Sequence, residues 1–276
     1  MNQFSEKTTL LRTQGVHLTL GENHILDGVD FEIKDIVQDG AVRGQVRCLL
    51  GPSGVGKTQF LRILAGLQAP NRGSVEIAWN GVDLVPAQAG MVGVVAQNYP
   101  LFEHLTVMEN LTLAGRRASA SAKEAGEKAT ALLERFRMAD RAHFWPSQLS
   151  GGQRQRIAIL QQVIVGRLFL IMDEPFSGLD PKALHGVLDL IRELATSHEL
   201  NTILIITHDI RSAVRIGERL HIMGREFDAA GQLVRGAHIV DSIDLLAMGV
   251  AWSPNIRQLP QFNEIVNDIE DRFERI

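Results

Sequence analysis

Alternating apolar and polar positions in short runs predict strands within residues 8–50. Residues 16–20 and 29–33 each place an apolar side chain at every second position, which is the period of a half-buried strand. Residues 21–23 predict a turn, and residues 35–45, with two glycines, predict a loop before a strand at 46–50. We therefore expect an antiparallel β lobe that leads into a buried strand.

The middle of the chain changes from strand periodicity to helix formers. Residues 119–138 are rich in Ala, Glu, Lys and Leu, so a helical insertion is expected there, extending to about residue 161. Residues 168–172 and 202–206 are short continuous apolar runs, and a helix is expected between them at 181–197. Strand, helix and strand in this order predict a parallel α/β core that binds ligands at the carboxyl ends of its strands.

The C-terminal tail carries a stripe of apolar residues at helical spacing, which predicts an amphipathic helix. The stripe consists of Phe262, Ile265, Val266, Ile269, Phe273 and Ile276. The sequence leaves two roles open for it, covering the core of its own chain or steadying a pair of chains.

Composition narrows the classes of protein that remain. The 276 residues include 45% hydrophobic residues, enough for a large core, and the net charge of -4 gives no basic field for nucleic-acid binding. One cysteine excludes an internal disulfide.

The longest apolar run, 163–172, is too short to span a membrane. Residues 1–11 do not resemble a secretion signal. We therefore expect a cytosolic location.

A glycine-rich segment after the strand at 46–50 fits the phosphate-loop pattern G-x-x-x-x-G-K-[ST]. It consists of Gly51, Pro52, Ser53, Gly54, Val55, Gly56, Lys57 and Thr58. Its backbone N–H groups are expected to cradle phosphates, with Lys57 at the β/γ oxygens and Thr58 on Mg²⁺. A chance glycine turn is the alternative, and the strand before it and the helix after it disfavour that alternative.

Two carboxylates end the apolar strand at 168–172. A phosphate-loop enzyme needs one acid near Mg²⁺ and one base near water. We assign Asp173 to the metal and Glu174 to the attacking water. By themselves these residues could equally be solvated carboxylates at a strand end.

The octapeptide at 149–156, Leu-Ser-Gly-Gly-Gln-Arg-Gln-Arg, resembles the signature of the ATP-binding cassette family. The resemblance covers nearly all of residues 8–225. It implies that Ser150 and Gly152 contact the γ-phosphate held by the other cassette of a dimer. Ser150, Gly151 and Gly152 also offer a hydroxyl and backbone donors at a predicted helix start, where a plain N-cap is the alternative.

Three further residues match motifs of the ATP-binding cassette family, and they occur along the chain in the same order as in the family. By resemblance, Gln97 contacts Mg²⁺ and water, Asp180 in 177–180 lines the dimer interface, and His208 hydrogen-bonds the γ-phosphate. His208 alone could be a core histidine. The other eight histidines show no zinc-ligand spacing.

The chain departs from the family pattern where an aromatic residue usually stacks on adenine, because Leu20 occupies that position. An aliphatic side chain can cover the base but lacks a π face, so base selectivity stays open. The predicted loop 35–45 is longer than usual, and residues 160–162 are Leu-Gln-Gln where small residues and arginine are common.

The resemblance implies a RecA-like P-loop core with an antiparallel β lobe and an inserted helical lobe. Residues 1–100 and 161–225 are expected to form the core with its β lobe, 101–160 the helical signature lobe, and 226–276 the tail. An apolar cluster after Gln97 is suited to receive a short helix from a membrane partner. That cluster contains Pro100, Leu101, Phe102, Leu105, Val107 and Met108.

The function implied is that of an ATPase subunit, using ATP and Mg²⁺, of a transporter on the inner face of the cell membrane. Its expected partners are a second cassette, transmembrane permease subunits and, for an importer, a substrate-binding protein, with no nucleic acid. Residues 101–107 and 172–176 resemble importer cassettes for small solutes. An exporter or lipid mover, and a soluble cassette ATPase acting on ribosomes or DNA, are the alternatives.

Overall fold

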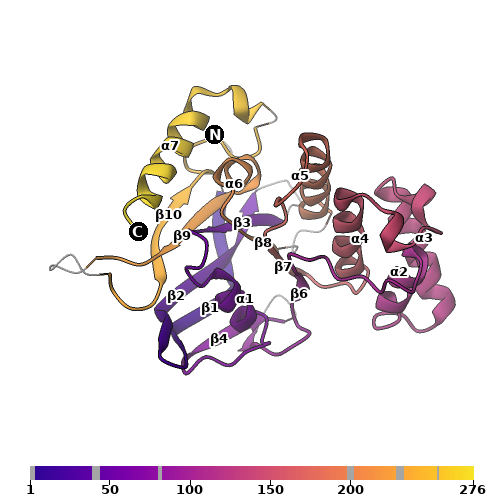
Figure 1. Cartoon of the computed structure of the whole chain (residues 1–276), viewed down its shortest axis with the longest axis horizontal. Coiled ribbons are helices and arrows are strands. Elements are labelled where there is room, and N and C mark those ends of the chain that lie inside the picture. The colour runs from indigo at the N-terminus through magenta and orange to yellow at the C-terminus, as the bar shows by residue number, and fades with distance from the viewer. Residues whose placement is uncertain (1–3, 39–43, 80–82, 198–201, 228–232, 254) are drawn as a thin grey trace.

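A six-stranded sheet carries the buried strands that the sequence predicts. The computed structural model describes residues 4–38, 44–79, 83–197, 202–227, 233–253 and 255–276. The strand order is β10-β9-β3-β8-β7-β6, with β10 antiparallel to β9 and the other neighbours parallel (Figure 1). The strands are β3 (Gln45–Leu50), β6 (Gly93–Val95), β7 (Phe169–Asp173), β8 (Thr202–Thr207), β9 (Arg219–Gly224) and β10 (His238–Asp244).

Successive residues of these strands pack on opposite faces of the sheet, as the pleat requires. In β7, Leu170 and Met172 belong to the core cluster under the helices, whereas Phe169 and Ile171 belong to the cluster that faces the second sheet. All five residues of β7 are buried. A continuous apolar run therefore suits a strand covered on both faces.

The second sheet is antiparallel, with the order β2-β1-β4-β5, and forms the predicted β lobe. Its strands are β1 (Phe4–Leu20), β2 (Asn23–Gln38), β4 (Arg72–Ala78) and β5 (Leu84–Pro86). The predicted loop at 35–45 is wrong for residues 35–38 and for Gln45, because β2 continues through residues 35–38 opposite the start of β1 and β3 begins at Gln45. Ile36 pairs with Glu6 there and is buried. Residues 39–43 lie outside the described part.

The helical lobe lies at one side of the molecule, at the right in Figure 1. It contains α2 (Val107–Gly115), α3 (Ala122–Arg135) and α4 (Gly151–Val163), with two short 3-10 turns between α3 and α4. α2 also contacts α4. The predicted lobe of residues 101–160 includes all of these except the last three residues of α4.

Helices also cover the face of the larger sheet opposite the β lobe. They are α5 (Pro181–Ala195), α6 (Ile210–Ile216) and α7 (Pro260–Phe273). The predicted amphipathic tail helix is confirmed as α7, and its residues Phe262, Ile265, Val266 and Ile269 are buried in the main core cluster. This burial supports the first of the two roles left open, covering the chain's own core.

The segment before α7 belongs to the core sheet. β10 lies within the predicted tail 226–276, yet it forms an antiparallel ladder with β9. Within the described residues, no helix combines the length and apolar content that a membrane span needs.

Candidate nucleotide-binding site

The phosphate loop connects the carboxyl end of β3 to the first turn of α1 (Lys57–Leu64). Gly54 has φ +80° and Gly56 has φ +122°, conformations that residues with a Cβ rarely adopt. A Cβ on Gly56 would also lie 3.1 Å from a methyl group of Ile25. Glycine at these positions therefore lets the loop curve closely around an anion at the start of α1.

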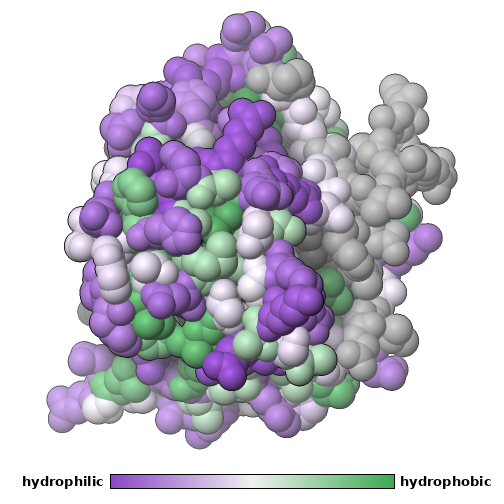
Figure 2. Space-filling model, turned by 90° about the vertical axis from the view of Figure 1, so that its right-hand side faces the viewer, coloured by the Kyte–Doolittle hydropathy of each residue, from purple (hydrophilic) through white to green (hydrophobic). Residues whose placement is uncertain are grey.

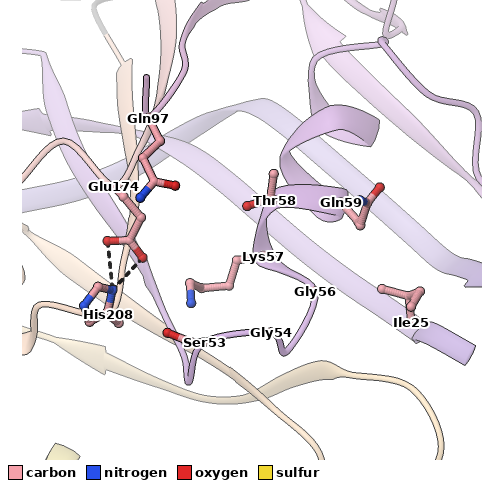
Figure 3. Close-up of a pocket in the computed structure, with 10 residues that line it drawn as sticks. All are labelled: Ile25, Ser53, Gly54, Gly56, Lys57, Thr58, Gln59, Gln97, Glu174 and His208. Atoms are coloured by element: carbon pink, nitrogen blue, oxygen red, sulfur yellow. Dashed lines mark hydrogen bonds and ion pairs between the residues drawn. The ribbon is translucent and has the colours of Figure 1, made fainter. Parts of the chain in front are cut away.

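Lys57 places a buried ammonium group inside this curve. Its Nζ donates to the carbonyl oxygens of Gly51 at 2.7 Å and Pro52 at 3.0 Å. Burial lowers the pKa of Lys57, while the nearby Glu174 and Asp173 carboxylates oppose that shift. In Figure 3 the side chain extends from the loop into the space beside Glu174 and His208, where it can meet a phosphate.

Thr58 and Asp173, both predicted magnesium ligands, lie next to each other. Thr58 Oγ1 donates to Asp173 Oδ2 at 3.1 Å. Burial raises the pKa of Asp173, and the hydrogen bond from Thr58 partly offsets this. A hydroxyl and a carboxylate are hard oxygen donors of the kind Mg²⁺ prefers. The described residues form no cluster of three or more His, Cys, Asp or Glu ligands.

Glu174 and His208 form one hydrogen-bonded unit, although their motifs predict separate roles. The imidazole Nδ1 of His208 lies 2.8 Å from Glu174 Oε1, and its backbone N–H donates to Oε2 at 3.4 Å (Figure 3). Thr207 Oγ1 also donates to Oε2, at 2.9 Å. The carboxylate of Glu174 is therefore fixed at the edge of the cavity, with a neighbour that can share a proton.

The backbone of Glu174 is strained, with φ +48° in a residue that has a Cβ. Its N–H donates to Ile206 O at 2.7 Å, and Tyr99 Oη donates to its carbonyl at 3.3 Å. Burial and the two carboxylates raise the pKa of Tyr99 to about 12, so its hydroxyl stays a donor. The sequence does not predict a role for Tyr99 or Thr207. Thr207 could have been suspected because it directly precedes His208, whereas no signal in the sequence indicates Tyr99.

These groups surround a cavity of about 390 Å³. Its lining residues are Ile25, Ser53, Gly54, Gly56, Lys57, Thr58, Gln59, Gln97, Glu174 and His208 (Figure 3). Three predicted loop residues do not line it. Gly51 and Pro52 contribute the carbonyls that hold Lys57, and Val55 is buried in the core. Ile25 and Gln59 were not predicted, because neither belongs to a motif.

The signature residues lie away from this cavity, on the helical lobe. Ser150 caps α4 by accepting from Gln153 N at 3.3 Å, and Gln153 Oε1 accepts from Ser150 N at 3.0 Å. Ser150 and Gly151 are exposed, whereas Gly152 is buried, and a Cβ on it would lie 2.8 Å from Ala183 Cβ. The exposed start of α4 therefore places the Ser150 hydroxyl and the N–H groups of a helix N-terminus at the surface of the helical lobe.

Three other predicted residues also do not line the cavity, and one of them is Asp173, which is hydrogen-bonded to Thr58 of the lining. Asp180 is exposed and caps α5, with its Oδ1 accepting from Lys182 N and Ala183 N. Leu20 ends β1 and is 42% exposed. The chain therefore brings the phosphate loop, the two carboxylates, Gln97 and His208 together, and leaves Leu20, Ser150, Gly151 and Asp180 at its surface.

Comparison with known proteins identifies the family. A family profile described as ABC transporter matches residues 36–177, about half of the chain. The chain belongs to the ABC transporter family. Within this family it is the nucleotide-binding ATPase subunit, and its mixed α/β fold is that of an ABC cassette.

Two curated relatives and one solved structure show the extent of the similarity. The probable amino-acid ABC transporter ATP-binding protein y4tH of Sinorhizobium fredii is 37% identical over 72% of this chain and 80% of its own length. The sulfate/thiosulfate import ATP-binding protein CysA 2 of Shewanella oneidensis is 37% identical over 78% of this chain, but only 59% of its own length. The dimeric cassette MJ0796 bound to ADP and phosphate has a TM-score of 0.68 at 26% identity and covers 86% of this chain and 99% of its own.

Proposed function

We propose that two copies of this cassette, or this cassette and a similar one, close around two Mg-ATP molecules and drive import of a small solute through membrane permease subunits. The proposal rests mainly on one observation: within one chain, the predicted site residues lie in two separate places. Ser150, Gly151 and Asp180 are exposed and lie outside the cavity that contains Lys57 and Glu174. A second chain can bring the missing groups to the γ-phosphate, and the solved relative MJ0796 is dimeric.

Within each site, the residues of this chain would divide the work of phosphoryl transfer. Lys57 and the loop N–H groups bind the phosphates, while Thr58, Asp173 and Gln97 hold Mg²⁺, which supplies charge neutralisation when bound. Glu174 takes a proton from the attacking water, and His208, which lies beside Glu174, contacts the γ-phosphate. Closure of the pair and reopening then move the partner.

The helical lobe provides the surface for the membrane partner. Leu101 and Val107 of the predicted apolar cluster are buried, but Phe102 is 48% exposed. Leu113 and Trp145 in the same lobe are also exposed. Figure 2 shows the side of the molecule that this lobe forms, where apolar residues gather among hydrophilic ones. Such a patch suits a short amphipathic helix of a permease at the inner face of the membrane.

Import of a small solute is supported by the relatives. One is named for amino-acid transport and another for import of sulfate or thiosulfate, and a substrate-binding protein would deliver such a solute to the permease. We infer the same class of cargo, a small polar solute, for the transporter that contains this chain.

Ser150→Ala is expected to lower ATP hydrolysis roughly tenfold to hundredfold, the range for one lost hydrogen bond to a charged group. Ser121→Ala is the matched control, because Ser121 caps α3 by accepting from Glu124 N at 3.1 Å. Each substitution removes a helix cap and should cost about 1 kcal/mol of folding free energy.

The measurement is specific ATPase activity against protein concentration, with the unfolding free energy measured beside it. For the natural chain and Ser121→Ala, specific activity should rise with concentration because pairing completes the site. If Ser150→Ala and Ser121→Ala lost the same amount of ATPase activity, Ser150 would act only as a helix cap. That result would contradict a site shared between two chains.

A further inference from the structure

The turn of residues 174–177, called here the Glu174 turn, has a backbone conformation that its own sequence does not favour. Glu174 directly follows β7 and has φ +48°, in the left-handed region, although it has a Cβ. The next residue is Pro175, and a proline favours extended conformations in the residue before it. Contacts from elsewhere in the chain must therefore hold Glu174 in this conformation.

Two side chains from distant segments donate to the carbonyl groups of the Glu174 turn. Tyr99 Oη donates to Glu174 O at 3.3 Å, and Gln155 Nε2 donates to Pro175 O. On the other side of Glu174, its N–H donates to Ile206 O at 2.7 Å. Because each peptide unit is planar, bonds to the N–H and the carbonyl of one residue fix the two planes that define its φ and ψ. Tyr99 therefore fixes the plane after Glu174, and Gln155 fixes the next one.

Both donors have features that stability alone does not favour. Tyr99 has φ +46°, so the donor lies in the same sparsely populated region as the residue it contacts. Gln155 is 0% exposed, and its Oε1 has no hydrogen-bond partner among the residues that the structure describes. A buried amide oxygen without a donor is unfavourable, so an apolar side chain would suit this position better if packing were its only role.

The segments that supply the two donors are joined to each other beside the Glu174 turn. Tyr99 lies two residues after Gln97, and Gln155 lies on α4, the helix that begins with the signature. Arg154 of α4 forms an ion pair with Glu103, which follows Tyr99 in the same segment. The segment after β6 and the signature helix therefore contact the Glu174 turn together.

We propose that Tyr99 and Gln155 are positioning residues for ATP hydrolysis. Their hydrogen bonds hold the backbone of Glu174 in the left-handed conformation and so place its carboxylate to accept a proton from the attacking water. In Figure 3 the Glu174 side chain extends toward His208, and rotation of either flanking peptide plane would move it from this place. Neither donor lines the cavity, so both act through Glu174. The inference rests on the proposed role of Glu174 as the base.

The test is steady-state ATP hydrolysis by the full chain, with ATP affinity measured by calorimetric titration. Tyr99→Phe removes only a hydroxyl, and Gln155→Met replaces the amide with an apolar side chain of similar length. Each substitution should lower kcat roughly threefold to tenfold, the factor that corresponds to one lost hydrogen bond. ATP affinity should stay natural, because the phosphate loop is untouched.

Matched substitutions elsewhere control for the chemical change. Thr130→Val removes an exposed hydroxyl on α3 that donates to Gly126 O at 3.0 Å, and Gln161→Met makes the glutamine change on α4 itself. Both controls should keep the natural kcat and the natural ATP affinity.

The same two substitutions are then placed in the Glu174→Gln chain. Neither Tyr99→Phe nor Gln155→Met should lower its residual turnover further, because the base through which they act is already absent. An equal fall with and without Glu174 would overturn the inference, as would natural kcat in either single variant or a loss of ATP affinity. Natural turnover in Glu174→Gln itself would overturn the proposed role of the base. A slow Glu174→Gln chain beside natural Tyr99→Phe and Gln155→Met chains would overturn this inference alone.

Discussion

A Glu174→Gln chain will bind ATP but hydrolyse it about 10²–10⁴ times more slowly than the natural chain, the range for loss of a general base. Glutamine retains an oxygen that can accept from Thr207 Oγ1, which lies 2.9 Å from the natural carboxylate. It cannot accept a proton from water at this position. Since the phosphate loop is untouched, the ATP-bound pair of cassettes should accumulate.

The measurements are ATP turnover, ATP affinity and the mass of the chain in solution with and without ATP. Glu134→Gln removes an equivalent charge from the exposed surface of the helical lobe, and turnover should stay at the natural rate. If Glu174→Gln hydrolysed ATP at nearly the natural rate, Glu174 would not be the base that accepts the proton from water. Loss of ATP binding would show that its carboxylate maintains the structure of the site.

Lys57→Ala will instead remove nucleotide binding. The ammonium group is buried within the phosphate loop and held by the carbonyls of Gly51 and Pro52. Truncating a buried charge partner costs about 2–5 kcal/mol, which corresponds to roughly 30-fold to several thousand-fold in ATP affinity. Hydrolysis should fall in parallel at ATP concentrations that saturate the natural chain.

The control is Lys123→Ala, since Lys123 is exposed on α3 and its side chain is 87% accessible. ATP affinity measured by titration should be natural in this variant and lost in Lys57→Ala. An unchanged affinity in Lys57→Ala would mean that the loop does not bind the phosphates.

The sequence predicts those parts of the site whose residues are neighbours in the sequence. The phosphate loop, the Asp173–Glu174 pair and His208 each lie at the carboxyl end of an apolar strand, so their place at one edge of the sheet follows from parallel topology. Structural similarity to ABC cassettes confirms this fold.

The parts that the sequence does not predict depend on pairing between distant segments. β2 continues past residue 35 because the start of β1 pairs with it, and β10 joins the core sheet beside β9. Tyr99 reaches the backbone of Glu174 from 75 residues away in the sequence. Ile25 meets the phosphate loop only when the two sheets pack together. Local periodicity carries no information about such contacts.

The shared site is tested most directly by mixing two inactive variants, Lys57→Ala and Ser150→Phe. A mixed pair combines the intact phosphate loop of one chain with the intact signature of the other, and so contains one complete site. Each variant alone should be nearly inactive. An equal mixture should recover about one quarter of natural ATPase activity, because half of the random pairs are mixed and each has one of two sites. A mixture no more active than its separate components would contradict the two-chain site.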